Sequence, residues 1–163
     1  QVNQCLYHAR LHLDHAASHA GDAAFAQSRL RSDLHAAVLE LYRAMVFLAM
    51  ELDVLPATAA DLPLASAAQL QQRLAAAQAS SPSAALGEWL RRLHLPAYRQ
   101  LCAAYESLWR CLPRVESQSP AATDDNLLKI KEIDNELALP DCQQWLAAVR
   151  ELVDACRAAE AEF

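Results

Sequence analysis

The chain has 163 residues, of which 54% are hydrophobic and 21% charged, enough to close one core, so we expect a single domain spanning residues 1–163. It contains 35 Ala and 27 Leu but only two Gly and two Thr, which predicts an all-α fold, an antiparallel bundle of five to six helices. Two glycines also exclude the glycine-rich loops of nucleotide-binding proteins and the G-x-S-x-G elbow of hydrolases.

The chain is acidic, because it has 14 Lys and Arg residues and 20 Asp and Glu residues, which gives a net charge of −6. Nucleic-acid partners are not expected, since phosphate backbones select a basic surface. The longest uncharged apolar run, residues 44–50, is far shorter than the roughly 20 residues of a bilayer span, and no secretory signal is visible. We therefore expect a cytoplasmic protein without a membrane partner. The five cysteines form no C-x-x-C, so we expect reduced thiols packed in the core.

Apolar residues at helical spacing predict a first helix over residues 2–20, closed by Gly21 as a left-handed cap. The second helix has the strongest pattern, because two apolar rows run side by side through residues 34–52, and Pro56 ends it. A helix that is apolar on two sides belongs in the middle of a bundle.

Serines mark the starts of the next two helices. After a loop, Ser66 is expected to cap a short helix over residues 67–79. Ser81 is expected to cap the helix that follows, with Pro82 at its first helical position and its end near Leu93.

A fifth helix is predicted from residue 96 to residue 112. The segment 127–139 is ambiguous, because its apolar residues suit a helix whereas its alternating polarity and Asp134-Asn135 suit a two-residue turn. We favour a small β-hairpin there. Asp141 is then predicted to cap the last helix, with a Gln at the third helical position completing a capping box.

One run of residues near the start of the chain has the form of a family signature, Asn3-Gln4-Cys5-Leu6-Tyr7-His8-Ala9-Arg10-Leu11. The surroundings of Leu39 and Tyr42, the pair Tyr105 and Trp109, and an apolar hairpin before a Trp-containing last helix follow in order. In these features, nearly the whole chain resembles an uncharacterised helical domain family of pseudomonads and related proteobacteria. The resemblance implies a bacterial helical protein and no mechanism, because that family has no assigned activity.

Four histidines stand at spacings of four, three and four residues: His8, His12, His15 and His19. On a helix their imidazoles lie within about 60° of one another. Histidines one turn apart can share Zn²⁺ or Ni²⁺, so the stripe is an alternative metal site, to which His35, Glu40 or Asp22 would add a ligand only if the fold brings one of them near. The stripe also suits a proton-responsive surface. Because the stripe points away from the Leu6 and Leu13 face, we favour a plain solvent-exposed surface that binds metal only weakly.

A second candidate site is the pair Arg29 and His35, whose spacing resembles the Arg/His motif of HEPN ribonucleases. There His would move a proton on and off the ribose hydroxyl while Arg stabilised the phosphorane charge. In those enzymes the motif opens a late helix, whereas here it opens the second predicted helix. Because R-x5-H carries little information, residues that merely decorate a helix surface are the alternative interpretation.

The favoured function is a protein–protein interaction or adaptor module, hetero-partnered or self-associating, without intrinsic catalysis or cofactor. A metal- or pH-responsive helical protein using the His stripe and a HEPN-like ribonuclease are the alternatives. Trp89, Trp109 and Trp145 lie on apolar faces and are expected in the core. Arg91 and Arg92, which follow Glu88 closely, are expected on a solvated face.

Overall fold

The computed structural model describes residues 1–19, 24–55, 66–110 and 137–161, and the fold is described for these ranges. Within them the chain forms six helices and no strand: α1 (Val2–Ser18), α2 (Ala24–Glu51), α3 (Ala67–Ser80), α4 (Ala84–Arg92), α5 (Pro96–Arg110) and α6 (Leu139–Ala161). The all-α class predicted from the composition is confirmed.

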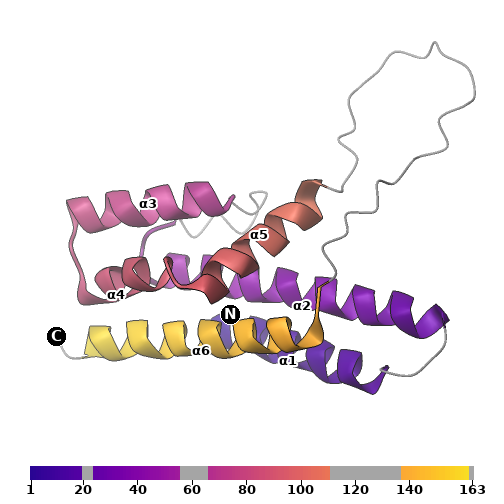
Figure 1. Cartoon of the computed structure of the whole chain (residues 1–163). Coiled ribbons are helices and arrows are strands. Elements are labelled where there is room, and N and C mark those ends of the chain that lie inside the picture. Colours follow the sequence, from indigo (N-terminus) through magenta and orange to yellow (C-terminus); the bar gives the residue numbers. More distant parts are fainter. Residues whose placement is uncertain (20–23, 56–65, 111–136, 162–163) are drawn as a thin grey trace, which may run out of the picture.

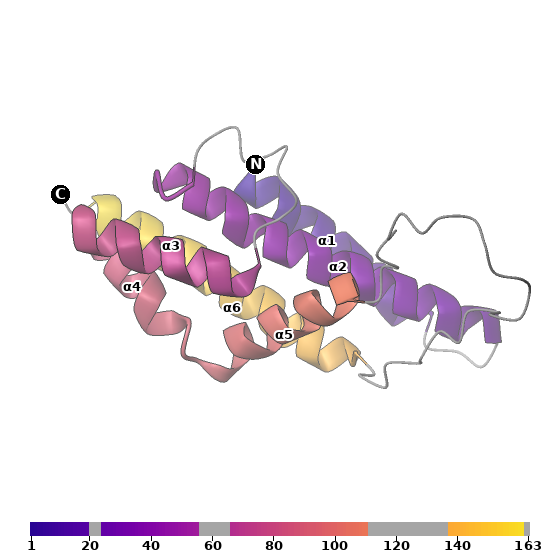
Figure 2. The same ribbon diagram turned by 90° about the horizontal axis from the view of Figure 1, so that it is seen from above.

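Helices α1 and α2 lie side by side and antiparallel, with the most extensive contact of any helix pair in the described ranges (Figure 1, Figure 2). α1 turns one face inward at steps of three and four residues, and Ala9 and Ala16 on that face are fully buried. Small side chains let two helix backbones approach closely. The packing therefore fixes the side chains of α1 relative to those of α2.

α2 lies in the middle of the bundle, because it packs against α1, α5 and α6. Its central residues are at most 1% exposed: Leu41, Tyr42, Ala44, Met45, Leu48 and Ala49. The Tyr42 ring stacks on that of Tyr105 in α5, with ring centroids 3.6 Å apart and planes 6° from parallel. This central position is the one that the two apolar rows predict.

α6 packs against α1 and α2 and also contacts α4 and α5 (Figure 1). α3 lies against α4 and buries Leu70 and Leu74. Trp89 of α4 and Trp145 of α6 are buried at 0% and 4% exposure, which confirms their predicted place in the core. The side chain of Trp109 lies outside the described part of the chain.

The cap of α3 is confirmed, whereas the predicted cap of α4 is wrong. Ser66 Oγ accepts the N–H of Gln69 at 3.2 Å, and Gln69 Oε1 accepts the N–H of Ser66 at 3.0 Å. α4 is capped by Ser83, whose Oγ accepts the Leu86 N–H at 3.1 Å. Ser81 is instead the C-cap of α3. Ser81 and Ser83 are both candidate caps for α4, but only Ser83 lies directly before its first turn.

Two further boundaries differ from the predicted ones. α1 ends at Ser18 rather than at residue 20, and Gly21 lies outside the described residues. α2 begins at Ala24, so Arg29 and His35 lie within the helix and do not open it. Partly buried Leu30, which precedes the two apolar rows, packs against the core and so favours helix before residue 34.

The hairpin predicted over 127–139 falls almost entirely outside the described residues. Its last residue, Leu139, is helical because α6 begins there. Asp141, predicted as the N-cap, therefore stands in the first turn of α6. Its negative charge is favourable near a helix N-terminus, and Pro140 is tolerated there because the first helical N–H groups have no partner within the helix.

Candidate functional site

The histidine stripe of α1 lies partly in the seam between α1 and α2, and it is less exposed than expected. The side chains of His12 and His19 are 36% and 29% exposed. His8 is also partly buried, and of the four only His15 is exposed. The stripe therefore faces solvent only in part, because α2 covers one edge of α1.

Asp33 of α2 places its carboxylate between two of these histidines. Its Oδ1 lies 3.1 Å from His12 Nδ1, and its Oδ2 lies 3.8 Å from His19 Nε2. The Asp33 side chain is only 18% exposed. A neutral His12 that donates from Nδ1 to this carboxylate keeps its lone pair on Nε2, which is the atom then available to bind a proton or a metal ion.

Asp33 is not among the three residues predicted to complement the stripe. Of those three, Asp22 lies outside the described residues, and Glu40 accepts a hydrogen bond from Arg43 at 2.7 Å. His35 is partly buried in α2, and burial, aided by the charge of Arg31, lowers its pKa below 6.5.

The structure does not bring the four histidines together as one chelating cluster. In the ranges described here, no three His, Cys, Asp or Glu side chains are placed so that they could bind one metal ion. Among the described residues, at most two protein ligands could therefore hold one metal ion on the stripe, with solvent completing its coordination.

The pair Arg29 and His35 does not converge on one point of α2. Six residues of an α-helix rotate by about 600°, which is one full turn plus about 240°, so the two side chains leave the helix roughly 120° apart. Arg29 is exposed, whereas His35 is partly buried and faces a different side of α2. The geometry therefore gives the nuclease hypothesis no shared site on this helix.

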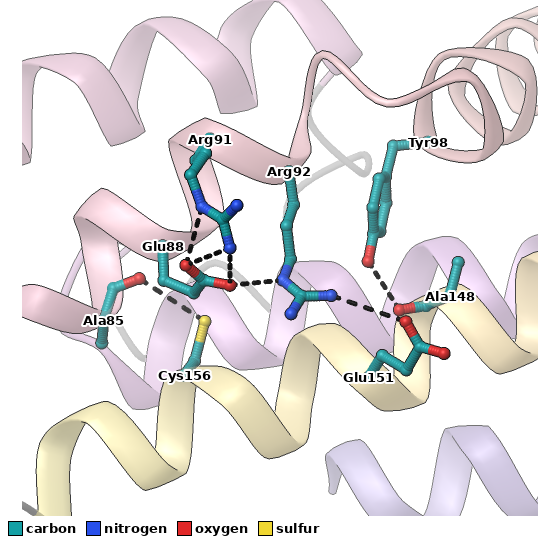
Figure 3. Close-up of polar contacts among 8 residues, drawn as sticks. All are labelled: Ala85, Glu88, Arg91, Arg92, Tyr98, Ala148, Glu151 and Cys156. Carbon is teal, nitrogen blue, oxygen red and sulfur yellow. Dashed lines mark hydrogen bonds and ion pairs between the residues drawn. The ribbon is translucent and has the colours of Figure 1, made fainter.

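A polar cluster joins α4 and α5 to α6 (Figure 3). Arg91 and Arg92 both donate to the Glu88 carboxylate, at 2.8 Å and 2.6 Å, and Arg92 also lies 3.6 Å from Glu151 of α6. These hydrogen bonds, from Arg92 first and then Arg91, lower the pKa of Glu88. The predicted solvated face is confirmed for Arg91, whose side chain is 72% exposed, and is wrong for Arg92, whose side chain is only 20% exposed because it lies between Glu88 and Glu151. The cluster attaches α4 to α6.

Tyr98 attaches α5 to α6 in the same region (Figure 3). Its hydroxyl donates to the carbonyl oxygen of Ala148 at 2.6 Å, and its side chain is 2% exposed. Nearby, the Cys156 thiol lies 3.5 Å from the carbonyl oxygen of Ala85 in α4. Both contacts are satisfied within the fold, as expected of structural groups.

The four described cysteines are free thiols in surroundings that keep them protonated. Burial raises the pKa of Cys5 and Cys102 to about 11 and that of Cys142 and Cys156 to about 12. Because the thiolate is the nucleophile and the metal ligand, these side chains are inert at neutral pH. Cys111 lies outside the described residues.

The outer face of α1 exposes two large apolar side chains that the sequence analysis did not single out. Tyr7 is 58% and Leu11 40% exposed, one helical turn apart and opposite the buried face of the helix. Among large apolar side chains in the described ranges, only Leu95, at 48%, is comparably exposed. Their spacing of four residues, out of phase with the buried face, is visible in the sequence.

No known protein family, curated protein or solved structure matches the chain. Membership of the bacterial helical family that the chain resembles thus stays a prediction. Among the helices that the structure describes, none is both long and apolar enough to cross a membrane.

Proposed function

We propose that this protein is a protein–protein interaction module of the bacterial cytoplasm, without catalysis of its own, that binds its partner along the outer face of α1. The observation that carries the proposal is the exposure of Tyr7 and Leu11 on that face. Aromatic side chains contribute strongly to binding because they bury a large area with few rotatable bonds.

The rigidity of α1 favours this face as a docking surface. Six residues on its other side are buried in the core, and Arg157 of α6 donates to Asn3 at 3.0 Å and to Glu51 of α2 at 3.0 Å. A partner therefore meets Tyr7 and Leu11 in fixed positions and loses little free energy to ordering them.

The charge of the chain favours a basic partner. At a net charge of −6, the protein attracts cationic surfaces and repels anionic ones, which raises the rate of encounter with a basic protein. We take the partner to be a basic protein that lays an apolar helix face along α1. The described thiols support a noncatalytic role, because their raised pKa values leave them protonated.

The proposal is tested by comparing what three forms of the tagged protein retain from extracts of the native cells. The double variant Tyr7→Ser/Leu11→Ser removes the proposed surface, and Leu95→Ser is the matched control that removes an exposed leucine from another element. We expect a basic protein that binds wild type and the control, is lost with the double variant, and dissociates as salt rises.

Circular dichroism of the double variant should match that of wild type, because both changed residues are exposed. A partner that binds all three forms equally, a partner lost equally with the control, or no basic partner for the wild type would each refute the proposal.

A further inference from the structure

We propose that His8 and His12 of α1 form a binding site for a divalent transition metal such as Zn²⁺ or Ni²⁺, and that Asp33 of α2 orients His12 for that role. The juxtaposition that carries this inference is the hydrogen-bond contact of 3.1 Å between His12 Nδ1 and Asp33 Oδ1. It is independent of the docking surface proposed above.

The two proposed ligands are one helical turn apart. Residues at i and i+4 of a helix have Cβ atoms about 5–6 Å apart on the same face, so their imidazoles can meet at one ion. α1 is regular over this stretch, and its inward face, with Ala9 and Leu13 at 0% and 2% exposure, fixes its backbone. Imidazole nitrogen is a ligand that Zn²⁺, Ni²⁺ and Cu²⁺ accept readily.

Asp33 gives His12 the second contact that histidine ligands usually have in metal sites. A carboxylate that accepts the N–H of one ring nitrogen fixes the tautomer, orients the ring and makes the other nitrogen a better ligand. Asp33 is suited to this role because it comes from a different helix and is only 18% exposed. Its second oxygen, Oδ2, faces His19 Nε2 at 3.8 Å, which further restricts the carboxylate.

The pair His15 and His19 has the same spacing but lacks the same geometry. His19 follows the last residue of α1 as its C-cap, with φ −94° and ψ 8°, so it departs from the helical repeat. The ring of His15 is exposed and has no hydrogen bond or ion pair with the described part of the chain. His8 and His12 are therefore the better pair, and solvent completes the coordination of the ion.

The experiment is a calorimetric titration of the full chain with Zn²⁺ and with Ni²⁺. We expect one ion per chain, a one-to-one isotherm that His8→Gln and His12→Gln each abolish, and unchanged binding by His94→Gln. His94 is the matched control because it is an exposed histidine outside the stripe. Asp33→Asn should weaken binding by roughly tenfold to a hundredfold, the usual effect of removing such an orienting carboxylate.

The urea midpoint of Asp33→Asn, measured without metal, separates orientation of His12 from a merely structural role. Weaker metal binding by a variant whose unfolding midpoint equals that of wild type supports the proposal. Unchanged affinity in Asp33→Asn or in His8→Gln, an equal loss in His94→Gln, abolition by His15→Gln or His19→Gln alone, or several ions bound per chain would overturn it. A loss of affinity in Asp33→Asn matched by an equal loss of stability would also count against it.

Discussion

At the scale of single residues, burial decides the chemistry of the cysteines. Cys142 and Cys156 are both 0% exposed, and burial is the largest cause of their raised pKa values of about 12. The free thiol of an unfolded chain has a pKa near 8.5, so unfolding increases the reactive thiolate fraction at pH 8 by on the order of a thousandfold.

We expect the four described thiols to react slowly with Ellman's reagent in the native protein and rapidly in guanidinium chloride. A Cys111→Ser background removes the thiol that lies outside the described residues. The measurement is the time course of thionitrobenzoate release at pH 8. One thiol per chain that reacts in the native state at the rate of a free cysteine would show that one of these environments is more open than the structure indicates.

Residues within one helix were predicted more successfully than residues on two helices. The common face of His8 and His12 follows from their spacing alone, because the helical repeat fixes angles around one axis. The contact between His12 and Asp33 depends on the position of α2 along the axis of α1. That register is set by packing of the whole α1–α2 pair, so the spacing of residues within one helix does not identify Asp33 as a neighbour of His12.

At the scale of helices, caps were predictable where a single candidate residue was present. Ser66 stands alone before its helix, and both hydrogen bonds of its capping box form. Before α4, Ser81 and Ser83 flank Pro82, and local preference alone does not choose between them. The choice falls to Ser83 because α3 extends through Ser80 and requires Ser81 as its C-cap.

Replacing the α3 cap should destabilise that helix locally. Ser66→Ala removes the acceptor for the Gln69 N–H and is expected to cost about 1 kcal/mol. Ser80→Ala is the matched control, because Ser80 Oγ donates to the Ala77 carbonyl at the other end of the helix and caps no N–H. The measurement is amide hydrogen exchange of α3 residues. Equal protection in both variants would contradict a capping role for Ser66.

The attachment of α5 to α6 should depend on the Tyr98 hydroxyl. Tyr98→Phe keeps the ring in its buried position and removes the 2.6 Å hydrogen bond to the Ala148 carbonyl. We expect a loss of about 1 kcal/mol in the free energy of unfolding, the usual net value for one such hydrogen bond. Tyr7→Phe, which removes an exposed hydroxyl, should change it little. Urea unfolding of both variants measures the difference, and equal losses in Tyr98→Phe and Tyr7→Phe would contradict a stabilising role for the Tyr98 hydroxyl.

At the scale of the whole molecule, composition determines the class of fold but not the order in which helices meet. An Ala- and Leu-rich chain with two glycines favours helices throughout, and the pattern of α2 predicts its central position. The placement of α4 and α5 on α6 involves residues far apart in sequence, including Arg92 with Glu151 and Tyr98 with Ala148. Such pairs are set by tertiary packing, which no local pattern encodes.

The stability of the whole molecule should fall in two steps on acidification, the first below pH 6.5 and the second below pH 4.5. His35 has a lowered pKa because burial, and then Arg31, disfavour its charged form. On acidification, the imidazole of His35 therefore takes up its proton at a higher pH in the unfolded chain than in the folded one, and stability is lost as the pH falls below 6.5. Glu88 also has a lowered pKa, here because Arg92 and Arg91 stabilise its charged form, so stability present above pH 4.5 is lost below it.

Urea unfolding at each pH, in buffer containing a chelator, measures this profile. His35→Gln should flatten the profile just below pH 6.5, whereas Glu88→Gln should lower stability at pH 7 and flatten the profile below pH 4.5. Glu160→Gln, at an exposed carboxylate of α6, is the control and should leave the profile as it is. A wild type that gained stability on acidification from pH 7 to pH 5 would contradict this prediction. The lowered pKa values of His35 and Glu88 both require the unfolded chain to bind more protons than the folded one. The prediction would also be wrong if His35→Gln kept the full slope below pH 6.5, because another group would then be titrating there.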